Sequence, residues 1–91
     1  AICVSDLSAF GALMECHRRG LKVPGDIAIA GFGNYEIASC CHPRITSVDI
    51  ECHEIGLLAA RKIIQSIQNP DAAARKAPVM THIRVIERES T

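Results

Sequence analysis

Two short polar stretches each follow a predicted buried strand and have the residue types of a small-molecule site. Ser5-Asp6 follows the apolar start of the chain, and Gly33-Asn34 follows the uninterrupted apolar run 27–32. In parallel α/β sheets, small ligands bind in the crevice outside the carboxyl ends of the strands. We therefore expect Ser5, Asp6, Gly33 and Asn34 to lie at one edge of a sheet and to form half of a ligand cleft.

Each of these residues also has a structural explanation that needs no ligand. Ser5 or Asp6 could cap the following helix by accepting hydrogen bonds from its free N–H groups, and Asp6 could orient the strand end. Asn34 could be a turn residue that tolerates positive φ, and Gly33 could supply only the backbone freedom of that turn. The residue types fit either explanation, so both remain open.

Cysteine and histidine cluster in Cys40-Cys41-His42 and in Cys52-His53, which are ligand types of a zinc site. Adjacent cysteines cannot easily occupy two corners of a tetrahedron, and a thiol nucleophile would need a third group to orient His42. The five cysteines are an odd number, which is typical of free thiols in a reducing cytosol. We therefore predict no metal, no cofactor, no catalytic site and a cytoplasmic location.

Length and composition limit the protein to a small folded unit. The 91 residues suffice for one small domain, and the 48% of apolar residues exclude a disordered chain. A net charge of zero argues against a nucleic-acid surface within these residues. The chain starts inside an apolar run without Met, signal peptide or membrane-spanning run, so we expect a fragment of a longer protein.

The order of elements predicts an α/β fold with a parallel sheet flanked by helices. A buried strand at 2–4 is followed by a helix that runs to about Arg19 and ends at Gly20 with a left-handed cap. The apolar run 27–32 has the pattern of a central parallel strand. Strand, helix and strand within about 30 residues form a right-handed βαβ unit.

The second half of the chain predicts another strand, a helix and a final edge strand. After a loop at 33–44 with one helical turn, a strand at 45–48 leads to Asp49, a plausible cap for a helix at 51–68. Asn69-Pro70 ends this helix, and the polar loop 71–78 follows. The core face of the helix is expected to consist of Leu57, Ala60, Ile63, Ile64 and Ile67.

The last predicted strand lies within residues 79–87, where apolar and polar side chains alternate. Ile83 and Val85 would face the core, and His82 and Arg84 would face solvent.

Residues spread over most of the chain resemble the C-terminal part of the lactose-repressor (LacI/GalR) family of bacterial transcription regulators. Each piece is weak alone, but their order and spacing are specific. The matching residues are Ser5-Asp6 with Ala9 and Gly11, the run 20–24 with Asp26, Gly31-Phe32, Pro43, Ile45-Thr46, the run 54–56 with Ala59-Ala60, and the run 87–91. Within the family, Ser5-Asp6 and the run 31–33 are most similar to repressors of gluconate utilisation.

The resemblance implies a periplasmic-binding-protein-like (type I) domain, in which two α/β subdomains hold a sugar-sized ligand between them. Residues 1–91 would be a single partial domain, the C-terminal subdomain. The N-terminal subdomain and the helix-turn-helix domain would lie outside it. The implied function is the effector-sensing and dimerisation part of a repressor, without enzymatic activity. Its partners would be a sugar or sugar acid, a second copy, and operator DNA through the absent domain, with no membrane partner. The alternative is a solute-binding protein of the same fold without DNA function.

The resemblance also implies a dimer interface on two segments. In the family, the helix that corresponds to the first predicted helix of this chain pairs with its copy in the partner subunit. The resemblance therefore assigns Phe10, Leu13 and Met14 to that contact. A second piece of the interface is similar to the segment 37–41 and contains Ile37, Cys40 and Cys41.

Two departures from the family pattern concern the ligand. The family commonly has an asparagine at position 5 and an aspartate at position 33, and both often contact the effector. Ser5 reaches less far than asparagine, and Gly33 has no side chain to bind sugar hydroxyls. Because a carboxylate at position 33 would repel an anionic ligand, its absence fits an acidic effector such as gluconate.

Overall fold

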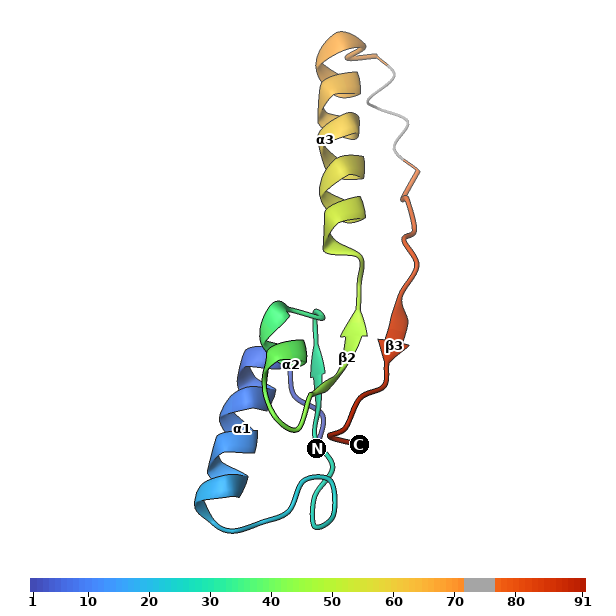
Figure 1. Ribbon diagram of the computed structural model, residues 1–91. Coiled ribbons are helices and arrows are strands. Elements are labelled where there is room, and N and C mark those ends of the chain that lie inside the picture. The colour runs from blue at the N-terminus through green and yellow to red at the C-terminus, as the bar shows by residue number, and fades with distance from the viewer. Residues whose placement is uncertain (72–76) are drawn as a thin grey trace. The chain divides into compact units, whose positions relative to one another are not determined.

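The computed structural model describes residues 1–71 and 77–91 (Figure 1). The predicted loop 71–78 lies mostly outside these residues. In chain order the elements are α1 (Asp6–Arg18), β1 (Ala30–Phe32), α2 (Glu36–Cys40), β2 (Thr46–Asp49), α3 (Cys52–Gln68) and β3 (Arg84–Ile86).

The chain divides into two compact units. The sheet unit contains Ala1–Ile50 and Ile83–Thr91, and the helical unit contains Glu51–His82.

The sheet unit contains a three-stranded sheet in the order β1-β2-β3. β1 and β2 are parallel, with Gly31 opposite Ser47, whereas β2 and β3 are antiparallel, with Asp49 opposite Arg84. The predicted α/β fold is confirmed, and the sheet is mixed because its last strand runs antiparallel to β2. An antiparallel edge strand on an otherwise parallel sheet is common in α/β folds.

The first predicted strand is present only as an isolated parallel bridge between Ile2 and Ala30. Cys3 N donates to Ala30 O at 2.8 Å, so the direction of the segment is as expected. The predicted burial of this segment is wrong, because Ile2 and Val4 are exposed. The run 27–32 is likewise a strand only from Ala30, although Ile29 is fully buried. An apolar run indicates a capacity for burial and does not ensure that a neighbour covers it.

Local interactions at both ends explain where α1 begins and ends. Ser5 is the N-cap, and its Oγ accepts a hydrogen bond from Ser8 N at 3.2 Å. At the other end Gly20 has a φ of +71°, and Leu21 N donates to Cys16 O at 2.9 Å. This Schellman motif confirms the predicted left-handed cap, which favours glycine because it has no Cβ.

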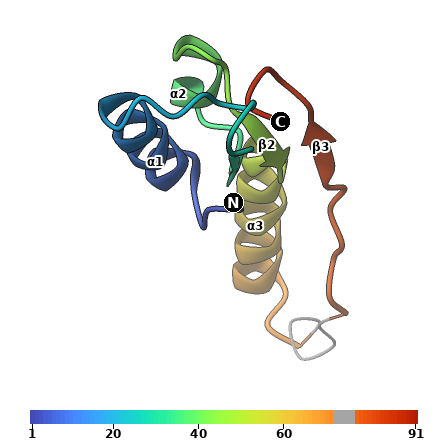
Figure 2. The same cartoon turned by 90° about the horizontal axis from the view of Figure 1, so that it is seen from below.

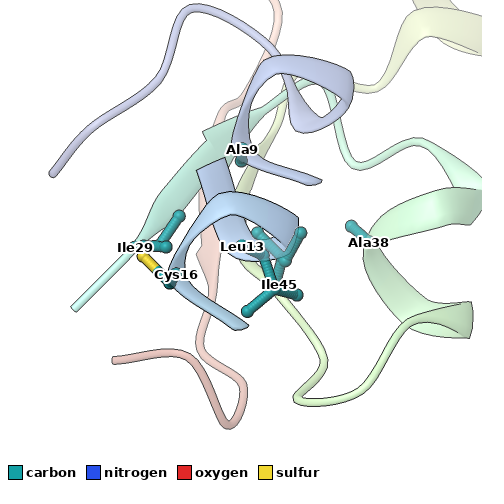
Figure 3. Packing of buried hydrophobic residues seen from close by; sticks show 6 residues of the cluster. All are labelled: Ala9, Leu13, Cys16, Ile29, Ala38 and Ile45. Atoms are coloured by element: carbon teal, nitrogen blue, oxygen red, sulfur yellow. The ribbon is translucent and has the colours of Figure 1, made fainter. Parts of the chain in front are cut away.

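Within the sheet unit, a small apolar core joins α1 and α2 to the sheet. α1 packs against both β1 and α2, and Figure 2 shows the two helices side by side. Figure 3 shows Leu13 and Ile45 close together at the centre of the cluster. Fully burying one such side chain stabilises the fold by about 1.5–3 kcal/mol. The buried apolar residues are Ala9, Leu13, Cys16, Ile29, Ala38 and Ile45.

The helical unit contains α3, which matches the predicted helix 51–68 to within one residue. No side chain of α3 is buried, so the predicted core face, including Ile63 and Ile67, is exposed in this chain. The helical period of the apolar residues predicts the helix correctly. The period does not show whether another element covers the apolar face of that helix. None of the helices in the described part of the chain is both long and apolar enough to cross a bilayer.

Two further predictions for the sheet unit are wrong. Asp49 does not cap α3; it is the last residue of β2, and its Oδ2 pairs with Arg84 Nη2 at 3.1 Å. Glu51 is the N-cap residue of α3. Ile83 and Val85 do not face the core, since both are exposed. The alternating pattern identified an edge strand but could not tell which of its faces is covered.

Candidate ligand site at the carboxyl ends of the strands

Asp6 is the centre of a polar cluster that connects α1 with the ends of β1 and β2. Its side chain is fully buried, and its carboxylate accepts hydrogen bonds from Ser47 Oγ at 2.5 Å and from Tyr35 N at 2.6 Å. A Cβ on Gly31 would clash with Asp6 Oδ1, so this close approach requires glycine. Asp6 therefore orients the strand ends. This corrects the expectation that it touches a ligand or caps the helix, because it has no exposed surface and Ser5 is the cap.

Asn34 lies in the turn after β1 and is held on three sides. Its φ of +52° confirms the prediction of a turn residue in the left-handed region. Its backbone N donates to Ser47 Oγ at 3.0 Å, and its Nδ2 donates to Asp49 Oδ2 at 3.3 Å. Its Oδ1 accepts from Arg88 Nη2 at 2.6 Å. The half-buried amide is thus fixed at the sheet edge where a ligand would bind.

Gly33 has a conformational and a steric reason to be glycine. Its φ is +112°, which side chains rarely adopt, and an added Cβ would lie 2.6 Å from Tyr35 Cε2. Its N–H donates to Val48 O at 2.8 Å, which extends the ladder between β1 and β2. The absence of a carboxylate here is explained by the backbone and by Tyr35, so it is not evidence of an acidic effector.

Sequence reasoning missed Ser47, Tyr35 and Arg88. Ser47 is fully buried and bridges Asp6 and Asn34 through its hydroxyl. Arg88 donates to Ile45 O at 2.8 Å as well as to Asn34. A hydroxyl within a buried strand was the available signal for Ser47, because a buried polar group needs partners. No local pattern connects Arg88 with Asn34.

The residues assigned to a dimer contact have different surroundings. Leu13 is fully buried in the core of the sheet unit, which leaves no surface for a partner and removes it from the predicted set. Phe10 is half-buried against this core, and Met14 on the same helix is 40% exposed. In α2, Ile37 is half-buried and Cys40 is exposed; Cys41, just after α2, packs against the core.

The segments rich in cysteine and histidine do not group into a metal site within residues 1–71 and 77–91. Cys40, Cys41 and Cys52 are free thiols, and among the described residues no three His, Cys, Asp or Glu side chains are grouped to hold a metal. Away from the strand ends, Arg44 N donates to Glu89 Oε2 at 2.8 Å and Arg44 Nε donates to Oε1 at 3.0 Å. These two hydrogen bonds lower the pKa of Glu89. The bond from Arg44 N has the larger effect, and the bond from the Arg44 guanidinium has the next largest.

Comparison with known proteins places this geometry in a family. Residues 1–91 match the model of the periplasmic binding protein-like domain. The HTH-type transcriptional regulator GntR of Escherichia coli (strain K12) is 41% identical over 66 residues, which cover 72% of this chain and 20% of GntR. GntR is, by its name, a transcription regulator.

Two solved structures show the same arrangement of elements. A PurR family transcriptional regulator from Vibrio parahaemolyticus is 34% identical with a TM-score of 0.81, over 98% of this chain and 31% of that one. A periplasmic binding ribose operon repressor protein from Lactobacillus acidophilus is 28% identical with a TM-score of 0.89, over 99% of this chain and 33% of that one. The chain therefore spans about a fifth to a third of the length of the proteins it matches. It belongs to the periplasmic binding protein-like domain family, in the form carried by transcription regulators of the lactose-repressor type.

Proposed function

We propose that the chain is part of the effector-sensing and dimerisation domain of a DNA-binding transcriptional repressor that acts in the cytoplasm. The observation that carries this proposal is the polar cluster of Asp6, Asn34 and Ser47 where the carboxyl ends of β1 and β2 meet. Ligands of α/β domains bind at this edge. Residues 1–91 would be a single partial domain, the C-terminal subdomain.

The proposed effector is a sugar or a sugar acid such as gluconate. A ribose operon repressor among the matched structures supports the first class, and the likeness of Ser5-Asp6 and the run 31–33 to gluconate-utilisation repressors supports the second. Asn34 and Ser5 would contact the ligand together with the backbone at Gly33. Asp6 would act through the positions of these residues. No cofactor, metal or catalytic step is required.

The proposed mechanism is a shift between two arrangements of the domain. An effector can drive such a shift only if its affinity differs between the two arrangements. A second copy, packed against the outer side of α1 and α2, would transmit the change to DNA-binding domains that lie outside these residues.

Thermal denaturation of the full-length protein tests the sensing function. We expect one member of a panel of D-ribose, D-glucose, gluconate and uridine to raise the Tm, because a ligand at a hundred times its Kd stabilises a protein by about 2.7 kcal/mol. Asn34→Ala should reduce this shift, and Leu21→Ala, an exposed apolar residue after α1, should retain it. A Tm that no ligand changes would rule out the sensing function.

Retardation of DNA from upstream of the protein's own gene separates a repressor from a solute-binding protein of the same fold. A repressor retards this DNA, and the effector changes the retardation. A protein that binds the effector but does not retard any such DNA would have to be assigned to the solute-binding class.

A further inference from the structure

Tyr35 places an exposed aromatic ring at the carboxyl end of β1. Tyr35 is 55% exposed. The ring atoms Cε2, Cδ2 and Cζ lie 2.6, 3.0 and 3.1 Å from the position that a Cβ on Gly33 would occupy. The ring therefore covers the turn at the place where a side chain at position 33 would project, and it can do so only because residue 33 is glycine.

The backbone of Tyr35 is fixed by the same cluster that fixes the strand ends. Tyr35 N donates to the buried carboxylate of Asp6 at 2.6 Å, and Ala38 N donates to Tyr35 O at 2.9 Å. Asp6 is itself held by Ser47 Oγ. A ring on such a fixed base loses little conformational freedom when it binds a ligand, which is the advantage of a preorganised site.

The apolar core gives no reason for this ring. Tyr35 is neither a member of the buried cluster nor one of the half-buried residues packed against it. It is also the single tyrosine of a chain that has no tryptophan and only 3% aromatic residues. An aromatic side chain that is fixed at its base, exposed at its ring and located at the ligand edge of the sheet fits a binding role.

We infer that Tyr35, with Gly33 beneath it, is an aromatic contact that selects a cyclic ligand with an apolar ring face, such as a cyclic sugar or a nucleoside. This inference rests on the proposed sensing function and names its ligand class. The ring face packs on the C–H face of a sugar or on a base, and the phenol hydroxyl remains able to form a hydrogen bond. An open-chain polyol has no fixed ring face and loses more conformational entropy on binding.

The guanidinium groups of Arg84 and Arg88 near the turn already have hydrogen-bond partners within the protein. Arg88 donates to Asn34 Oδ1 and Ile45 O, and Arg84 pairs with Asp49 Oδ2 at 3.1 Å. The guanidinium of Arg84 is thus paired with a carboxylate, whereas that of Arg88 is hydrogen-bonded to two neutral oxygens. A carboxylate ligand would have to compete with these partners for them.

Isothermal titration of the full-length protein tests the inference. The probes are D-ribose, D-glucose, uridine and sodium gluconate, and the variants are Tyr35→Ala and Tyr35→Phe, with Leu21→Ala as an exposed control. We expect one of the cyclic probes to bind most tightly. Tightest binding of ribose or glucose would identify a sugar ring as the ligand, and tightest binding of uridine would identify a nucleoside. Tyr35→Ala should raise its Kd by about tenfold or more, the usual loss of one stacking contact. Tyr35→Phe keeps the ring, so its Kd should stay within about threefold of the original value.

The variants also separate a contact from a folding defect. The bond from residue 35 to Asp6 uses the backbone N–H, so Tyr35→Ala should retain the Tm of the parent protein.

The possible outcomes distinguish this inference from the function on which it rests. A saturable ligand whose Kd is unchanged by Tyr35→Ala, or equally weakened by Tyr35→Phe, would overturn the aromatic contact and leave the sensing function intact. Gluconate as the tightest ligand would likewise overturn the selection for rings. Absence of binding by any probe, with intact protein, would contradict both.

Discussion

Arg88 Nη2 donates a hydrogen bond to Asn34 Oδ1 at 2.6 Å although 54 residues separate the two in the sequence. The same guanidinium donates to Ile45 O through Nη1 at 2.8 Å. The end of the chain thereby holds the turn after β1 and the start of β2 in a fixed relation. The candidate ligand site consequently depends on a residue that no motif near it would have indicated.

A double-mutant cycle measures this connection. Asn34→Ala and Arg88→Ala should each destabilise the full-length protein, and their coupling should be about 1–3 kcal/mol because a charged donor is involved and both groups are half-buried. Urea unfolding of the four proteins gives the coupling. The exposed pair of Glu15 and Arg18 is the control and should show a smaller value, because water screens it. Equal coupling free energies for the two pairs would mean that the Asn34–Arg88 bond stabilises the protein no more than an exposed ion pair does.

Gly33→Ala should destabilise the protein, whereas Gly11→Ala should not. A side chain at position 33 meets both a φ of +112° and the ring of Tyr35, so we expect a loss of about 1–3 kcal/mol. Gly11 lies within α1 with nothing within 4 Å of an added Cβ, and alanine there should stabilise the helix by about 0.5–1 kcal/mol. Thermal unfolding of the two variants provides the comparison. A stabilising Gly33→Ala would show that the turn adopts another conformation.

Asp6→Ala should be among the most damaging single changes in the sheet unit. It leaves Ser47 Oγ and Tyr35 N without their acceptor in a buried position, at a cost of about 2–4 kcal/mol. Glu54→Ala in α3 is the matched loss of an exposed carboxylate and should stay within about 0.5 kcal/mol. Chemical denaturation of both variants decides the point, and similar values for the two would contradict the role given to Asp6.

Met14→Glu tests the proposed contact between two copies. A charge on the exposed side of α1 would be desolvated in a dimer interface, so we expect the dimer to dissociate at concentrations where the parent protein stays paired. Leu21→Glu is the control, because Leu21 is 41% exposed and Met14 is 40% exposed. Sedimentation velocity measures the mass of each species. A Met14→Glu protein that sediments like the parent would place the dimer contact elsewhere.

Glu89 should make stability depend on pH on the acidic side. Hydrogen bonds from Arg44 lower its pKa from the ordinary value of 4.5 in the folded state, so the unfolded chain binds the proton more readily. The contribution of Glu89 is therefore fully present above pH 4.5 and is lost as the pH falls through the lower folded pKa. The stability difference between the parent and Glu89→Gln, followed by urea unfolding, should shrink over this range. A difference that is constant with pH would show that the carboxylate is not held by Arg44.

The sequence alone determined the local elements and the family. Apolar runs and turn residues gave the α/β order, Gly20 gave the cap of α1, and spaced motifs gave the resemblance that the comparisons confirmed. These features depend on neighbours within a few residues of each other, where backbone preferences and helical or strand periods operate.

The tertiary structure decided which polar groups meet and which apolar faces are covered. The partners of Asp6 come from Tyr35 and Ser47, and Asn34 is held by Arg88. The apolar face of α3 is exposed although its period predicted burial. Local patterns specify what a segment is able to bury or bond, but hydrogen bonds and packing between segments 29 to 54 residues apart require the folded chain.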